Sequence, residues 1–159
     1  MKKILLLVIA AGAIWWYITP DQPLTEEVVY EFYQQQEHQL LSRNPAGLCA
    51  LLAPEFEGVL NSSAGSRTED RDSACEAYQA MFDGFAALGE KMGGLLQLDS
   101  RYTIHSIQLV DEGKLAIVDV SYALDVAGSI MNIRSRSTET IIKRRGKPLL
   151  LRSTENRQP

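Results

Sequence analysis

Two histidines and one aspartate are the residues of this 159-residue chain whose types and positions suit acid–base chemistry. His38 follows Glu37 in an expected helix, and His105 lies in an expected strand. An imidazole beside a carboxylate can exchange protons, because histidine titrates near neutral pH. Asp119 lies on the polar side of another expected strand, and a cavity-facing position there would raise its pKa. The alternative, which we favour, is that these are exposed polar positions, Asp119 and His105 on the solvated face of a sheet.

Motifs that would identify an enzyme or a metal protein are absent from the sequence. We find no serine nucleophile elbow, HExxH pair, phosphate-binding glycine loop or CxxC pair. The only cysteines are Cys49 and Cys75, and their spacing fits no metal-ligand pattern. We therefore expect no metal and no cofactor. A disulfide between them, worth about 3 kcal/mol, is the expectation for an oxidising compartment, and two small buried thiols are the alternative.

A cluster of basic residues lies in the last two expected strands and the turn between them. This pattern predicts a docking patch for an acidic protein, anionic lipid headgroups or another polyanion of a cell envelope. No aromatic residue interrupts the cluster, so nucleic acid is not an expected partner. The alternative is a solvated face that balances acidic helices. The members of the cluster are Arg134, Arg136, Lys143, Arg144, Arg145, Lys147 and Arg152.

The charge of the chain divides at the point where helical periodicity gives way to strand periodicity. The net charge of −4 includes two N-terminal lysines, and −6 remains without them. Residues 21–99 hold 14 acidic and 4 basic residues, whereas residues 100–159 hold 6 acidic and 10 basic residues. We therefore expect an acidic helical layer and a basic sheet.

Residues 1–19 have the pattern of an export signal or a membrane anchor. Lys2 and Lys3 precede Ile4–Ile18, a run of fifteen uncharged residues that spans about 22 Å as a helix, short of a ~30 Å bilayer core. Cleavage after the Ala-Gly-Ala triplet would leave an Ile-Trp-Trp start, and Trp15 suits a membrane interface. These features favour an uncleaved anchor. Positive charge before the run and acidic residues after it predict a single-pass inner-membrane protein with a cytoplasmic N-terminus and a periplasmic domain. Secretion to the periplasm after cleavage is the alternative.

The rest of the chain predicts a linker at 20–24, one α+β domain at 25–155 and a short tail at 156–159. Apolar spacing predicts helices over Glu26–Ser42 and from Asn44-Pro45, and a third from a Ser73–Glu76 capping box to Met92. Residues 61–72 are expected to form a loop. We expect a strand over 56–60, and then alternating strands with a bulge near residue 106 and turns at 111–114, 127–129 and 145–147.

This order of elements resembles the nuclear transport factor 2-like (NTF2-like, or SnoaL-like) superfamily. The resemblance covers about Leu24–Thr154 and is one of architecture, without a diagnostic motif. It is carried by the three helices and by a closing run of strands at Ile104–Leu109, Lys114–Tyr122, Arg136–Ile142 and Pro148–Thr154. It implies three helices packed on a curved antiparallel sheet, a cone-shaped apolar cavity and homodimerisation through the sheet.

The function that we expect from these features is a non-catalytic binding or assembly role for a membrane-anchored periplasmic domain. The expected partners are the membrane, through the N-terminal helix, and an envelope protein or a small apolar ligand. Two alternatives remain open. One is an isomerase- or dehydratase-type enzyme that uses an acid–base residue in the cavity, and the other is a secreted periplasmic ligand carrier.

Overall fold

The computed structural model describes residues 23–94, 96–128 and 131–157. The expected anchor at 1–19 lies outside these residues. Within the described ranges, no helix is both long and apolar enough to span a membrane.

The first two helices begin at the caps that the sequence predicts. Helix α2 covers Glu26–Leu41, and the hydroxyl of Thr25 accepts a hydrogen bond from the Val28 amide. Helix α3 covers Pro45–Cys49, and the side chain of Asn44 accepts from the Gly47 amide. Proline at the first helical position loses no hydrogen bond, because that amide has no partner inside the helix.

Helix α4 covers Arg71–Lys91 and begins earlier than the sequence suggested. The capping box joins Asp70 and Ser73: the Ser73 amide donates to the Asp70 carboxylate at 2.9 Å, and the Asp70 amide donates to the Ser73 hydroxyl at 3.0 Å. The predicted box of Ser73 and Glu76 is therefore wrong, because Ser73 is the third helical residue rather than the cap. Gly93, with φ +80°, follows the helix end as expected.

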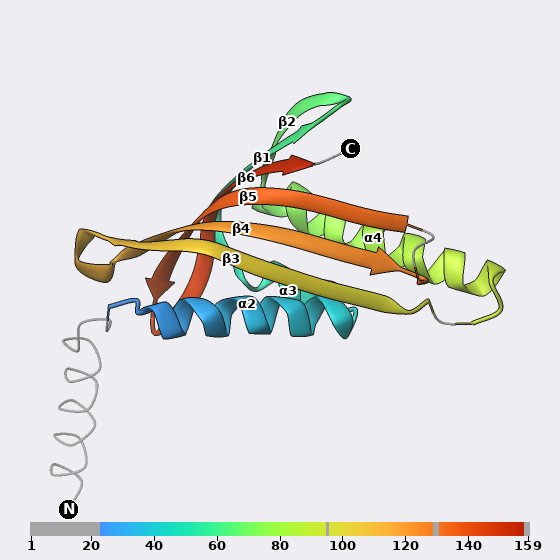
Figure 1. Ribbon diagram of the computed structural model, residues 1–159, viewed down its shortest axis with the longest axis horizontal. Helices are drawn as coiled ribbons and strands as arrows, with labels where there is room; N and C mark the ends of the chain where they lie inside the picture. Colours follow the sequence, from blue (N-terminus) through green and yellow to red (C-terminus); the bar gives the residue numbers. More distant parts are fainter. Residues whose placement is uncertain (1–22, 95, 129–130, 158–159) are drawn as a thin grey trace, which may run out of the picture.

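Six strands form one curved sheet in the order β2-β1-β6-β5-β4-β3 (Figure 1). Strand β1 pairs in parallel with β6, and every other neighbouring pair is antiparallel. The strands are β1 Leu52–Ser62, β2 Gly65–Asp70, β3 Leu98–Val110, β4 Leu115–Val126, β5 Met131–Arg144 and β6 Lys147–Arg157.

The largest difference from the sequence-based expectation is the hairpin of β1 and β2. The expected loop at 61–72 contains β2, and β1 is longer than the expected strand at 56–60. Strand β2 is mostly exposed and has no apolar alternation, so only its pairing with β1 defines it. Strand β6 likewise continues to Arg157, past the expected end at Thr154, because it pairs with both β1 and β5.

The predicted bulge in β3 is confirmed. The register between β3 and β4 shifts between Ile104 and Ser106, which leaves His105 as the extra residue. Such a bulge bends its strand and reverses which side chains face inward.

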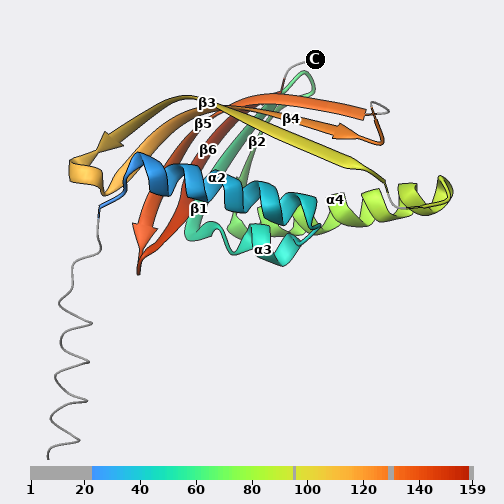
Figure 2. The same cartoon turned by 60° about the horizontal axis from the view of Figure 1, so that its bottom comes forward.

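Helices α2, α3 and α4 pack on the concave side of the sheet (Figure 2). The apolar residues of β4 that alternate toward this side, among them Val118, Val120 and Val126, are fully buried. Val118 and Val120 share one core cluster with Val29 and Phe32 of α2, whereas Val126 belongs to a second cluster with Phe82 and Phe85 of α4. The core is therefore the space between the sheet and the helices.

A disulfide joins α3 to α4. Cys49 and Cys75 are bonded, with Cα atoms 5.2 Å apart and a sequence separation of 26. This supports the expected cysteine pair. Because α3 is a single short turn of helix, the bond fixes it to the longest helix of the domain.

Removing the disulfide by Cys49→Ala with Cys75→Ala should lower the free energy of unfolding by about 3 kcal/mol, because the unfolded chain regains the freedom of a 26-residue loop. Urea unfolding of the variant and of the wild type measures this. The wild type with reductant serves as control and should match the variant. Equal midpoints for oxidised and reduced wild type would refute the contribution of the bond.

Candidate functional site

The strongest candidate for a functional group is Glu139, a carboxyl inside the domain. Strand β5 alternates strictly here: Arg134 and Arg136 are exposed, whereas Ser135, Ser137 and Glu139 are buried. The side chain of Glu139 therefore points to the helical side of the sheet, and the residue is only 3% exposed. A charged group at such a position needs internal hydrogen-bond partners.

Two tyrosine hydroxyls supply these partners. Tyr33 of α2 donates to Oε2 of Glu139 at 2.8 Å. The hydroxyl of Tyr122 of β4 lies 3.0 Å from Oε1 and 3.1 Å from Oε2, and 3.2 Å from Oε1 of Gln36. Because a hydroxyl has one proton, these three contacts of Tyr122 are alternatives. We call Glu139, Tyr33 and Tyr122 the glutamate–tyrosine cluster.

The electrostatics of the cluster are dominated by its burial. Removal from water raises the pKa of Glu139 to about 7, although hydrogen bonds from Tyr33 and Tyr122 act in the opposite direction. Burial, together with the nearby Glu139 charge, raises the pKa of Tyr33, Tyr122 and Tyr78 above the ordinary tyrosine value. Near neutral pH the tyrosine hydroxyls of the cluster therefore keep their protons, and the carboxyl of Glu139 is partly protonated.

Aromatic side chains surround the cluster. The ring of Tyr33 lies 5.6 Å from that of Tyr102, 6.4 Å from that of Tyr122 and 5.3 Å from that of Phe32, measured between centroids. A carboxyl with a pKa near 7 is suited to general acid–base catalysis. Here, however, both of its oxygens lie within hydrogen-bond distance of tyrosine hydroxyls, and Glu139 is almost fully buried.

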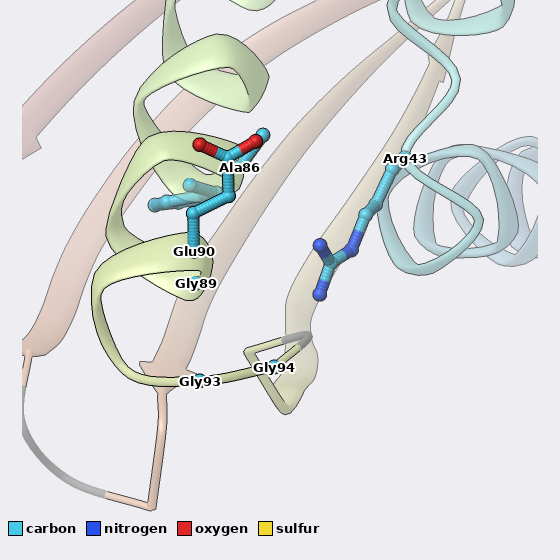
Figure 3. Close-up of a pocket in the computed structure, with 7 residues that line it drawn as sticks. Arg43, Ala86, Gly89, Glu90, Gly93 and Gly94 are labelled. Atoms are coloured by element: carbon cyan, nitrogen blue, oxygen red, sulfur yellow. The ribbon is translucent and has the colours of Figure 1, made fainter.

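An open groove lies elsewhere, beside the C-terminal half of α4. Its volume is about 440 Å³, and none of the cluster residues lines it. Figure 3 shows Arg43 reaching toward Gly94 from the α2–α3 connection, while Glu90 comes from α4. The guanidinium of Arg43 donates to the carbonyl of Leu96, so its orientation is set by the protein. The groove is lined by Arg43, Phe85, Ala86, Gly89, Glu90, Gly93 and Gly94.

Asp119 lies on the convex face of the sheet, away from the helices. The guanidinium of Arg136 binds it at two points, Nε to Oδ1 at 2.9 Å and Nη2 to Oδ2 at 2.6 Å. The hydrogen bonds and charge of Arg136 lower the pKa of Asp119. The raised pKa that a cavity-facing base would have is therefore not found.

The two histidines are both exposed and lie on different sides of the sheet. His105 occupies the bulge of β3 on the convex face, where its Nε2 lies 2.8 Å from the hydroxyl of Ser121. His38 lies in the last turn of α2, on the helical side. The structure therefore places His105 near Asp119 and separates His38 from both.

The basic cluster is divided between two places and largely paired with carboxylates. On the convex face, Arg136 pairs with Asp119 and Arg134 lies 3.2 Å from Asp125. Arg101 of β3 reaches the same Asp125 at 3.1 Å. Along β1, Glu55 pairs with Arg144, and Glu57 with Arg152 at 3.3 Å. Lys143, Arg145 and Lys147 extend the cluster around the β5–β6 turn.

Glu139 was not among the residues that the sequence singled out, although a signal for it exists. Arg134 and Arg136 are two positions apart in an expected strand, so the period of two assigns them to one face and residues 135, 137 and 139 to the other. What the alternation does not reveal is that this second face is the buried one, because Ser, Ser and Glu are polar. Among the described residues, no group of three or more His, Cys, Asp or Glu side chains is placed to hold a metal ion.

Comparison with known proteins identifies the fold. No protein-family model and no curated protein sequence matches the chain. Solved structures do: an NTF2-like protein of unknown function from Shewanella oneidensis MR-1 has a TM-score of 0.66 at 12% identity, over 84% of this chain and 99% of that one. An NTF2-like protein from Cytophaga hutchinsonii has a TM-score of 0.60 at 10% identity, over 85% and 99%.

A third similar structure is named as an enzyme candidate. It is a candidate scytalone dehydratase from Novosphingobium aromaticivorans, with a TM-score of 0.63 at 15% identity over 84% of each chain. At these identities the comparisons establish the fold alone. The domain is a mixed α+β structure with the NTF2-like fold, as the order of its elements predicted.

Stability should fall as pH rises through the range in which Glu139 titrates. Below pH 4.5, the ordinary pKa of a glutamate, the carboxyl is protonated in both the folded and the unfolded protein. Between pH 4.5 and about pH 7 it keeps its proton only in the folded protein. The free energy of unfolding should thus decrease by about 2 kcal/mol between pH 5 and pH 8. Urea unfolding at these values measures it.

The variant Glu139→Gln tests the assignment, because an amide cannot ionise. Its free energy of unfolding should lack this decrease, so the variant should gain stability relative to wild type as pH rises. Glu76→Gln, at an exposed position of α4, is the matched control and should follow the wild type. The same pH dependence in Glu139→Gln as in the control would show that another group is responsible.

Proposed function

We propose that this protein is a non-catalytic binding or assembly domain, held by residues 1–19 on the periplasmic side of an inner membrane. The observation that supports the non-catalytic role is the glutamate–tyrosine cluster. Among the described residues, Glu139 is the only buried carboxyl whose pKa is raised to about 7. It is bound by the hydroxyls of Tyr33 and Tyr122 and is 3% exposed. The anchor is supported by the two lysines and the uncharged run that follows them.

The surface that we assign to binding is the convex face of the sheet, which the described helices leave uncovered (Figure 2). Arginines and aspartates alternate across it: Arg101 and Arg134 flank Asp125, and Arg136 binds Asp119. A face that carries both signs of charge can pair with a second copy of itself, because a two-fold axis can set the arginines of one copy against the aspartates of the other. We therefore propose a homodimer through the sheet, with an envelope protein as the further partner.

An enzyme of the dehydratase or isomerase type is the second candidate. Two observations favour it: the pKa of Glu139 near 7, and the similarity of fold to the candidate scytalone dehydratase. Catalysis would require Tyr33 or Tyr122 to move away from Glu139 so that a substrate could reach the carboxyl. The two proposals differ in what Glu139 does, and this makes them separable.

The charge reversal Arg136→Glu should disrupt association through the sheet, because it places a carboxylate beside Asp119. Light scattering of the full-length protein in detergent should give a dimer for wild type and a monomer for the variant. The exchange Arg136→Glu with Asp119→Arg should restore the dimer. Arg67→Glu, on the exposed strand β2, is the control and should leave it intact. A monomeric wild type would contradict the homodimer.

Cross-linking in membranes of the source cell, followed by mass spectrometry, tests the binding role against the enzyme. A binding domain should retain its partner when Glu139→Gln is introduced and lose it with Arg136→Glu. If Glu139→Gln instead abolishes a cellular reaction while the cross-links persist, the enzyme is the correct assignment.

A further inference from the structure

Three segments of the chain meet at one end of the domain. The Leu24 amide donates to the Gly113 carbonyl at 2.7 Å, so the first described residues lie against the β3–β4 turn. Leu115, which follows this turn, pairs with Ile142 near the end of β5. In Figures 1 and 2 the start of α2, the β3–β4 turn and the β5–β6 turn lie at this same end. The chain that precedes Pro23 therefore joins the domain on the side of the β5–β6 turn.

The β5–β6 turn carries four positive charges within five residues, Lys143–Lys147, and we call this segment the basic tip. Arg144 pairs with Glu55 of β1, while the neighbouring side chains extend the charge along both strands. Arg144 and Lys147 are register partners, so the turn between them has two residues. The tip is thus a narrow, strongly basic projection of the sheet.

The turn itself keeps an arginine where another residue would be favoured. Arg145 has φ +50° and Gly146 has φ +76°, as in a type I′ turn. Asn, Asp or Gly adopts the first of these positions with less strain than arginine does. Strain retained at an exposed position is a reason to look for a role of the side chain that occupies it.

Acidic residues at this end of the domain belong to other segments. Glu26 and Glu27 lie in the first turn of α2, where they stabilise the helix terminus. Asp111 and Glu112 lie in the β3–β4 turn, and Asp111 is 3.2 Å from Lys114. The end is therefore polarised: the basic tip lies on β5 and β6, while these four acidic residues lie on α2 and the β3–β4 turn, and at the tip Glu55 pairs with Arg144.

We infer that the basic tip binds anionic lipid headgroups of the bilayer that holds residues 1–19, and that this contact orients the domain on the membrane. The inference rests on the anchor of the proposed function. Leu24 is buried in the domain and bonded to Gly113, so the linker that remains, 20–23, spans at most about 14 Å, and an anchored domain keeps the tip close to the membrane surface. Attraction to anionic lipid then selects the orientation in which the tip faces the bilayer and the acidic residues do not.

The test uses the full-length protein in vesicles of phosphatidylcholine, with or without one third phosphatidylglycerol. Amine-reactive labelling followed by mass spectrometry measures the accessibility of Lys143 and Lys147. Lys91, at the end of α4 far from the basic tip, is the internal control (Figure 1). In anionic vesicles the labelling rates of Lys143 and Lys147 should fall about fivefold, the change expected for one basic contact with an anionic surface, and Lys91 should not change. Added salt should remove the protection.

The variant Arg144→Glu with Arg145→Glu should restore labelling of Lys147 in anionic vesicles, whereas Arg67→Glu should leave the protection unchanged. Vesicle flotation after alkaline washing reports separately on the anchor. A chain that does not float overturns the anchor and, with it, the lipid contact. A chain that floats but is labelled equally in both kinds of vesicle overturns only the inference about the tip. Protection that appears in neutral vesicles only after an acidic protein is added would assign the tip to that protein instead.

Discussion

The carboxyl of Glu139 and the tyrosine hydroxyls that bind it form the interaction around which the domain is organised. The cluster joins β5, β4 and α2, and therefore ties the sheet to the helix that covers it. Burial disfavours the ionised carboxyl, and two phenols compensate in part. An apolar residue at this position would remove the acceptor of Tyr33 and leave Tyr122 with only Oε1 of Gln36, so the three side chains depend on one another. The interior of the domain is thus specified by a polar contact within an otherwise apolar core.

This organisation separates the inside of the domain from its surface. The inward face of the sheet is occupied by aromatic rings and branched aliphatic side chains, while the outward face carries arginines and aspartates in alternating order. The side chains of Tyr33, Tyr102 and Tyr122 pack around Glu139. The parts of the molecule left for recognition are the convex sheet face, the groove beside α4 and the basic tip. These differ in chemistry, so each suits a different kind of partner.

Local features of the chain that follow from short-range physics could be predicted from the sequence. Thr25 and Asn44 cap helices because their side chains accept hydrogen bonds from nearby amides, and the period of two after residue 96 defines the strands. The bulge at His105 is visible as a shift in the apolar phase. Strand β2 and the end of β6 could not be predicted, because each is a strand only through pairing with a distant segment. The start of α4 was misplaced because Asp70 and Ser73 both have cap-forming side chains.

The sequence by itself determined the α+β class, three helices and the strands that follow residue 96, since these depend on periodicity, capping and composition, and it favoured a disulfide between Cys49 and Cys75. It also placed Arg134, Arg136 and Asp119 in strands whose side chains alternate between the two faces of the sheet. Only the tertiary structure decided which side of each strand is buried. A period of two is the same for either face, and β5 has polar residues on both, so the burial of Glu139 depends on Tyr33 and Tyr122, which lie 106 and 17 positions away. The tertiary structure also brought the basic tip to the end of the domain that receives the N-terminal chain, because strand register joins β4 to β5 there.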